Sequence, residues 1–224
     1  MTGTQNSEAE VVERLRISEI FYSLQGETNT VGLPTVFIRL TGCPLRCGYC
    51  DTSYAFQGGE WQVLDSIMRQ VKSYQGRYVT VTGGEPLAQK TCARLLAQLC
   101  DQGYQVSLET SGSLSIAGLD PRVSVVMDLK TPSSGECERN LYDNIALLKQ
   151  GDQVKFVISN KQDFRWSAEQ LARYKLEDRC EVLFSPVHEE QDPAQLAQWI
   201  LDENLPVRFQ IQLHKILWGD RAGV

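Results

Sequence analysis

The sequence predicts an α/β fold built around one mostly parallel sheet. Short runs rich in β-branched residues recur along the chain, and segments with helical patterns stand between several of them. A strand, a helix and another strand, repeated, favour right-handed crossovers and parallel pairing. With 224 residues and 42% hydrophobic content, the chain is long enough for one large domain.

The predicted strands run from an early apolar segment to the C-terminal part of the chain. Residues 34–40 have the composition of a buried strand, and residues 78–82 form a second one that ends at a Gly-Gly-Glu-Pro turn. Similar runs predict strands over residues 105–109, 123–128, 154–158, 180–184 and 207–211.

Three segments between these strands have helical patterns. Residues 89–102 carry leucines at helical spacing, and Gly103 follows them as a C-terminal signal. Residues 193–203 follow an Asp-Pro pair that supplies an N-cap and a first turn. We expect residues 141–149 to be helical as well.

Composition and the N-terminus bear on several classes of protein. The net charge is −6 with acids and bases interspersed, so no basic stripe indicates nucleic-acid binding. No apolar run approaches the ~20 residues that cross a bilayer. The polar, acidic start has no signal-peptide pattern, so we expect a cytoplasmic protein without membrane contact. We also expect a flexible tail over residues 1–15 and a single domain over residues 16–224.

Three cysteines directly after the first predicted strand are the most informative feature. Cys43, Cys47 and Cys50 have the spacing C-x3-C-x2-C. Closed zinc sites and saturated iron–sulfur clusters take four protein ligands, so three thiols favour a four-iron cluster with one open iron. A zinc site would need a distant fourth ligand such as His188 or His214. A disulfide is disfavoured in a reducing cytosol.

Other polar residues also follow predicted strands. Gly83 and Gly84 follow the second, Thr-Ser-Gly at residues 110–112 the third, and Lys130 the fourth. The carboxyl ends of parallel strands line the binding site in α/β sheets and barrels. The unusual residues should therefore meet at one mouth of the sheet.

The cysteine spacing and the segment Thr82-Gly83-Gly84-Glu85-Pro86 resemble those of radical S-adenosylmethionine enzymes. The resemblance implies an incomplete (β/α)6 radical-SAM-type barrel with some helices missing or shortened. It implies a 4Fe-4S cluster on the three cysteines, with S-adenosyl-L-methionine on the open iron. A plain strand-to-turn joint is the other interpretation of the glycines. Residues that match the family's cofactor contacts are Tyr49, Cys50, Asp51, Gly83, Gly84, Glu85, Asp128, Leu129, Lys130 and Ser133. Some members read Ser-Pro-Lys where this chain has Asp128-Leu129-Lys130.

Three further segments resemble 7-carboxy-7-deazaguanine synthases: residues 23–27, residues 51–52 and residues 212–219. The resemblance covers about residues 17–224. It implies a carbon–nitrogen lyase of queuosine (7-deazapurine) biosynthesis that converts 6-carboxy-5,6,7,8-tetrahydropterin to 7-carboxy-7-deazaguanine with loss of ammonia. A 5′-deoxyadenosyl radical abstracts the hydrogen from carbon 6, and Mg2+ assists. A homodimer and an electron donor such as flavodoxin or ferredoxin are also implied.

The same resemblance implies a magnesium ligand and substrate contacts. Thr52 matches the magnesium-binding hydroxyl, and a hydroxyl that bonds its own loop is the alternative. Glu27 could accept from pterin N–H groups or be a solvated glutamate. Arg39, inside an apolar strand, needs a carboxylate from the substrate or from the protein. His214 is either a substrate contact or structural. The remaining substrate contacts are Leu24, Gln25, Gly26 and Thr82.

Two other functions stay open at this point. A glycyl-radical activase shares the cysteine loop and the Gly-Gly-Glu-Pro turn but acts on a protein partner. A non-catalytic electron-transfer module would have a saturated cluster and no affinity for S-adenosylmethionine. Residues 53–76 receive no role, and the C-terminal carboxylate on Val224 could approach the substrate.

Overall fold

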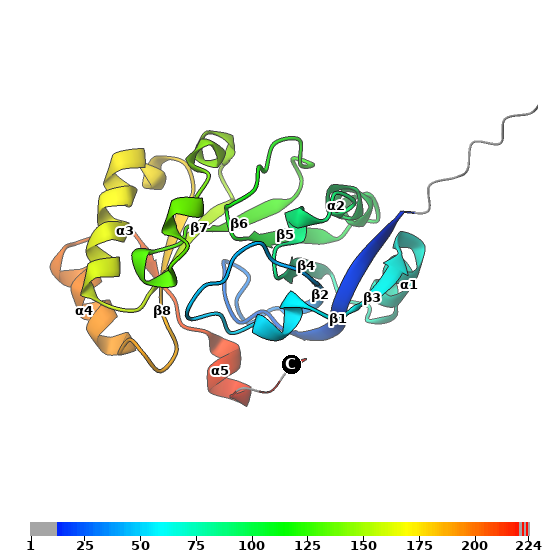
Figure 1. Cartoon of the computed structure of the whole chain (residues 1–224), viewed down its shortest axis with the longest axis horizontal. Helices are drawn as coiled ribbons and strands as arrows, with labels where there is room; N and C mark the ends of the chain where they lie inside the picture. Colours follow the sequence, from blue (N-terminus) through cyan, green and yellow to red (C-terminus); the bar gives the residue numbers. More distant parts are fainter. Residues whose placement is uncertain (1–12, 220, 222, 224) are drawn as a thin grey trace, which may run out of the picture.

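The described strands form one open sheet. The computed structural model describes residues 13–219, 221 and 223. Nine strands in this part of the chain lie in the order β3-β1-β2-β4-β5-β6-β7-β8-β9. From β2 across to β9 every pairing is parallel, whereas β1 pairs antiparallel with β2 and with β3. The terminal strands β3 and β9 do not pair with each other, so the sheet is open. Figure 1 shows the strands from β1 to β8 with the helices beside them. The predicted incomplete barrel with a mostly parallel sheet is confirmed.

Most predicted strands are present close to their expected bounds. They are β2 (Pro34–Leu40), β4 (Tyr78–Gly83), β5 (Gln105–Thr110), β6 (Ser124–Asp128), β7 (Gln153–Ile158) and β8 (Glu181–Pro186). The last, β9, is only Arg208–Phe209. Two further strands, β1 (Arg14–Leu24) and β3 (Glu60–Val63), were not predicted. They extend the sheet beyond β2 at its N-terminal edge.

The tail predicted over residues 1–15 needs a corrected end. Residues 1–12 lie outside the described residues, but Arg14 already begins β1. Leu15 is completely buried in the core. The ordered domain therefore begins before residue 16, because β1 pairs with β3 from its first residue.

The described α-helices are α1 (Leu64–Ser73), α2 (Cys92–Asp101), α3 (Lys161–Tyr174), α4 (Pro193–Asp202) and α5 (Leu213–Trp218). The predictions of α2 and α4 are confirmed, and the Asp192 side chain caps α4 by accepting from the Ala194 N–H at 2.9 Å. The helix predicted over residues 141–149 is wrong, since Tyr142–Leu147 is a 3-10 helix. The buried Asn144 side chain forms hydrogen bonds with the backbone between β5 and β6: its amide donates to the carbonyls of Gly112 and Leu114 and accepts from the N–H of Ile116.

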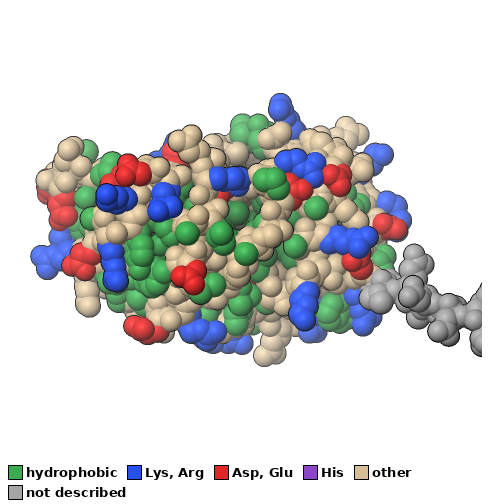
Figure 2. Space-filling view, turned by 90° about the horizontal axis from the view of Figure 1, so that it is seen from above, with side chains coloured by type: hydrophobic (Ala, Val, Ile, Leu, Met, Phe, Trp, Pro, Cys, Tyr) green, Lys and Arg blue, Asp and Glu red, His purple; other side chains and the backbone are tan. Residues whose placement is uncertain are grey.

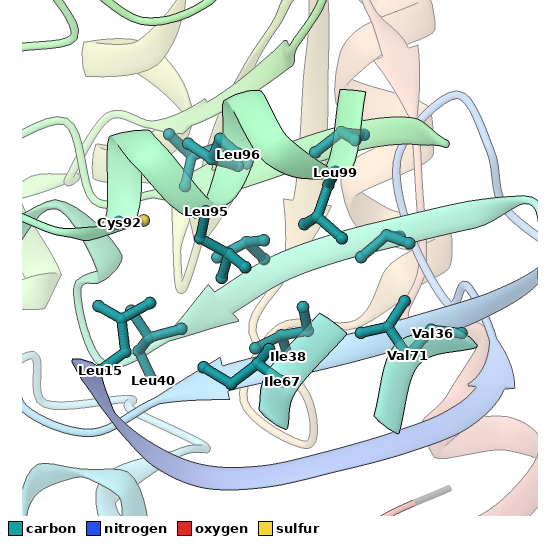
Figure 3. Packing of buried hydrophobic residues seen from close by; sticks show 14 of the residues in the cluster. Leu15, Val36, Ile38, Leu40, Ile67, Val71, Cys92, Leu95, Leu96 and Leu99 are labelled. Atoms are coloured by element: carbon teal, nitrogen blue, oxygen red, sulfur yellow. The ribbon is translucent and has the colours of Figure 1, made fainter. Parts of the chain in front are cut away.

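Two apolar layers hold the sheet in place. In the first, Leu95, Leu96 and Leu99 of α2 pack over strand residues such as Ile38 and Leu40 (Figure 3). In the second, three aromatic rings meet edge to face, with 5.5 Å between the centroids of Phe156 and Phe184 and 5.9 Å between those of Phe164 and Phe184. Each fully buried side chain of this size contributes about 1.5–3 kcal/mol of hydrophobic stabilisation. The packing fixes the strand ends that carry the polar residues.

The surface is mixed in character. Figure 2 shows Lys and Arg side chains interspersed with Asp and Glu on the face seen from above. Within the described residues, no helix combines the length and the apolar character needed to span a bilayer.

Candidate active site

A cavity of about 400 Å³ lies at the carboxyl ends of the parallel strands. Strand ends, the loop that follows β2, the segment after β1 and α5 all contribute to its wall. The cavity brings together most of the residues predicted from the sequence: Leu24, Gln25, Gly26, Glu27, Arg39, Cys43, Cys47, Tyr49, Cys50, Asp51, Thr52, Thr82, Gly83, Gly84, Asp128, Lys130 and His214.

Three residues predicted as cofactor contacts, Glu85, Leu129 and Ser133, are not among the residues that line the cavity. The carboxylate of Glu85 is fully buried and accepts from the N–H groups of Leu87 at 2.9 Å and Ser111 at 2.7 Å. Leu129 is fully buried in the second apolar layer. The Ser133 hydroxyl accepts from an asparagine side chain at 2.9 Å.

The cysteine loop presents three thiols to the cavity. Burial raises the pKa of the thiols of Cys43, Cys47 and Cys50, that of Cys47 to about 11, while Lys130 acts in the opposite direction. In the described part of the chain, no three His, Cys, Asp or Glu side chains converge on a point where a single metal ion would bind. An iron–sulfur cluster distributes its cysteines over different irons. Three thiols on one wall without a fourth fit such a cluster.

Close packing at Gly84 joins the end of β4 to the cysteine loop. A Cβ atom on Gly84 would stand 2.3 Å from the Gly42 carbonyl oxygen and 2.9 Å from the Cβ of Cys43. The next N–H group, that of Glu85, donates to the same Gly42 oxygen at 2.8 Å. A side chain at residue 84 would force the two segments apart, so the second glycine is a packing requirement.

The end of β6 carries a polar atom that lacks a protein partner. The Nζ atom of Lys130 lies 2.7 Å from Oδ2 of Asp128, whereas Oδ1 of Asp128 is buried without any hydrogen bond. Burial opposes the charge on Lys130, but Asp128, Tyr49 and Cys47 outweigh it and raise its pKa. Burial also raises the pKa of Tyr49 to about 12. Buried polar atoms are nearly always paired, so the unpaired Oδ1 of Asp128 is an exception at the end of a strand that lines the cavity.

The segment after β1 places Gln25 and Glu27 on the opposite wall. The Glu27 carboxylate pairs with Lys155 of β7 at 2.7 Å and accepts from the amide of Gln212 at 3.0 Å. The Gln25 amide donates to a carboxylate oxygen of Glu109 at 3.3 Å. The Glu27 side chain is only 12% exposed, so its solvated alternative does not hold.

Three wall residues, Glu109, Lys155 and Gln212, were not predicted. Glu109 also accepts from the Thr82 hydroxyl at 2.8 Å, and burial raises its pKa. Burial opposes the charge of Lys155, but Glu27, Asp128 and Glu109 outweigh it and raise its pKa. Both residues interrupt buried strands with a charge, which is the signal that singled out Arg39. Gln212 begins the segment 212–219 that resembles the family, but only His214 was taken from that segment as a contact.

Arg39 was expected to pair with a carboxylate from the substrate or from the protein, and the structure shows a protein carboxylate, that of Glu19. Its Nε atom lies 2.7 Å from Oε1 of Glu19, the residue directly opposite it in the β1–β2 pairing. The hydroxyl of Tyr54 donates to the same oxygen at 2.7 Å. Within the described chain, no hydrogen bond engages the terminal nitrogens of this guanidinium, which lines the cavity.

Thr52 and Asp51 form a local pair at the edge of the cysteine loop. The Thr52 hydroxyl donates to Oδ1 of Asp51 at 2.7 Å, as a loop-bonding hydroxyl would. Burial opposes the charge of Asp51, but Thr52, Lys155, Gln212 and Lys215 outweigh it and lower its pKa. The ionised carboxylate and the hydroxyl provide two hard oxygen atoms side by side.

His214 lies in the first turn of α5, beside the Gln25–Glu27 segment. The N–H group of the preceding Leu213 donates to the Gly26 carbonyl oxygen at 2.9 Å. Burial lowers the pKa of His214, whereas the nearby carboxylates of Glu27 and Asp51 act to raise it and offset only part of this effect. The predicted carboxylate of Val224 lies outside the described residues.

Known proteins that resemble this chain agree with these features. The Radical SAM superfamily profile matches residues 37–134, a range that contains the cysteine loop and the Gly-Gly-Glu-Pro turn. The 7-carboxy-7-deazaguanine synthase of Chlorobaculum tepidum is 43% identical over 214 residues, covering 94% of this chain and 97% of its own length. That of Methanospirillum hungatei JF-1 is 41% identical over 207 residues, covering 91% and 85%. The crystal structure of QueE from Escherichia coli superposes with a TM-score of 0.71 at 22% identity, over 90% of this chain and 95% of that one, which shows a shared fold.

Proposed function

This chain belongs to the 7-carboxy-7-deazaguanine synthase family, and from that premise we propose which of its residues serve the reaction. It is a radical S-adenosylmethionine lyase of queuosine biosynthesis that converts 6-carboxy-5,6,7,8-tetrahydropterin to 7-carboxy-7-deazaguanine with loss of ammonia. The glycyl-radical activase and the electron-transfer module are not favoured, because the likeness to these synthases extends over nearly the whole chain.

Cys43, Cys47 and Cys50 would hold the 4Fe-4S cluster at the cavity wall. When bound, the cluster and S-adenosylmethionine supply the 5′-deoxyadenosyl radical that removes the hydrogen from carbon 6 of the pterin. The three thiols carry the cofactor assignment, because they share one cavity wall with Asp128 and with the two glycines at the end of β4. The backbone of residues 83–85 follows the cysteine loop closely and offers further carbonyl groups.

The opposite wall would bind the pterin. Leu24, Gln25, Gly26 and Glu27 line it with backbone groups, an amide and a carboxylate. Thr82 and His214 border the same space. The terminal nitrogens of Arg39 could take the substrate carboxylate while Nε stays on Glu19.

Thr52 would be a protein ligand of Mg2+, with Asp51 beside it. Mg2+ favours oxygen ligands and keeps several waters, so a hydroxyl next to an ionised carboxylate suits it. The Thr52 hydroxyl would then leave its hydrogen bond to Asp51. The homodimer and the electron donor, flavodoxin or ferredoxin, stay predictions from the family.

An anaerobic assay tests the proposal. The reconstituted protein is given S-adenosylmethionine, a reductant, Mg2+ and 6-carboxytetrahydropterin, and the products are identified by mass spectrometry. We expect 7-carboxy-7-deazaguanine from the wild type, and neither cluster absorbance nor 5′-deoxyadenosine from Cys47→Ala. The matched control Cys137→Ala, outside the loop, should keep both. Retention of 5′-deoxyadenosine formation by Cys47→Ala would refute the cluster assignment.

A further inference from the structure

The Glu27 carboxylate is supported on both oxygens by residues from distant parts of the chain. Oε2 lies 2.7 Å from Nζ of Lys155 in β7, and Oε1 accepts from Nε2 of Gln212 at 3.0 Å. Gln212 precedes α5, and its Nε2 atom also donates to Asp51 at 3.2 Å. One amide therefore links the pterin wall to the cysteine loop.

The support restricts the position of the carboxylate without saturating it. A carboxylate oxygen has two lone-pair directions, so Glu27 has about four acceptor positions. Lys155 occupies one acceptor position on Oε2, and Gln212 occupies one on Oε1. The backbone N–H of Glu27 donates to Oε1 of Gln25 and therefore does not occupy a position on the Glu27 carboxylate. One acceptor position on each oxygen is left for a ligand.

One acceptor position on each oxygen is what a specific ring edge requires. A 2-amino-4-oxopteridine carries a ring N–H and an exocyclic amino group side by side, and both donate in the same direction. A carboxylate binds such a pair through two parallel bonds, as it binds a guanidinium. Lys155 places a positive charge 2.7 Å from Glu27 in a cavity that also contains Glu109 and Asp128.

We propose that Lys155 and Gln212 are positioning residues that hold the Glu27 carboxylate for the 2-amino and ring N–H groups of the pterin. The inference rests on the proposed function, since it takes the pterin as the ligand of this wall. Neither residue touches the reacting carbon in this account. They select the substrate by its amino-pyrimidinone edge and set its angle in the cavity.

The test measures affinity for two ligands on the cluster-loaded protein under anaerobic conditions. The ligands are 6-carboxytetrahydropterin and its analogue with oxygen in place of the 2-amino group. We expect Gln212→Leu and Lys155→Met to weaken binding of the amino compound by roughly 10- to 100-fold and to lose most of the preference over the analogue. Lys155→Arg should restore much of that preference, and Gln212→Leu should keep the affinity for S-adenosylmethionine.

Two comparisons keep the outcome decisive. Lys149→Met removes another lysine that is paired with a buried carboxylate, that of Asp152 at 2.6 Å, but outside the cavity wall, and should leave both pterin affinities unchanged. Gln212→Leu removes no charge, so it remains informative if Lys155→Met fails to fold. An unchanged preference in Gln212→Leu, or an equal loss of pterin and S-adenosylmethionine binding, would overturn the proposal. Absence of pterin binding by the wild type would instead contradict the proposed function.

Discussion

The Nδ1 atom of His214 lies 2.2 Å from the point where a Cβ atom on Gly26 would stand. The ring thus fills the space that the glycine leaves, and the backbone bond from Leu213 to Gly26 holds the two segments together. Gln210 adds two bonds to the backbone of Thr28, at 2.9 and 3.1 Å. The C-terminal segment therefore shapes the predicted pterin wall.

We predict that Gly26→Ala displaces His214 and weakens pterin binding. Forcing a methyl group into packed space costs about 1–3 kcal/mol of folding stability, measurable by urea unfolding. His214→Ala alone creates space at the same point. The double variant should therefore be less destabilised than the sum of the two single changes, because the clash is absent. Additive effects would show that the ring does not restrict residue 26.

Thr52→Ala should weaken the response of the reaction rate to Mg2+ while leaving the iron and sulfide content unchanged. Thr52→Ser keeps the hydroxyl and provides the matched control, which should respond as the wild type does. The physical reason is the loss of one hard oxygen ligand next to Asp51. The measurement is product formation against Mg2+ concentration, and an unaltered curve for Thr52→Ala would remove Thr52 from the metal site.

Glu85→Gln should lower the free energy of unfolding by about 3 kcal/mol without changing the urea m-value. The buried carboxylate accepts from Leu87, Thr110 and Ser111, and an amide would turn a donor toward other donors. The matched control Glu169→Gln, on the exposed face of α3, should stay within about 0.5 kcal/mol of the wild type. Equal stability of the two variants would contradict the structural role of Glu85.

Stability should depend on pH through His214. Burial lowers its pKa in the folded state, so the folded form favours the neutral ring. The contribution of the neutral ring to folding stability is fully present above the pKa of histidine in the unfolded chain, about 6.5. It is lost as the pH falls from there toward the lower pKa of His214 in the folded state. The stability difference between wild type and His214→Gln should therefore shrink on acidification, as followed by urea unfolding. A stability difference that stays constant on acidification would contradict this effect of burial on His214.

Local sequence features predicted most of the sheet and placed the three cysteines and the glycines at its strand ends. The three cysteines, Gly83, Gly84 and Asp128 each follow a strand within a few residues, and the parallel strand ends converge in any such fold. β1 was missed although Arg14-Leu15-Arg16-Ile17-Ser18 alternates polar and apolar residues, which is the pattern of a strand with one buried face; only its second half is irregular.

Tertiary structure alone decided which charges pair and which side chains turn away from the cavity. Glu19 meets Arg39 only through the antiparallel register of β1 and β2, two strands separated along the chain. Lys155 and Gln212 reach Glu27 across separations of 128 and 185 residues. Glu85 sits inside a recognisable motif, yet the turn after β4 directs its carboxylate to Thr110 and Ser111. Sequence patterns report local backbone preference and burial, whereas partners and directions depend on how distant segments are packed together.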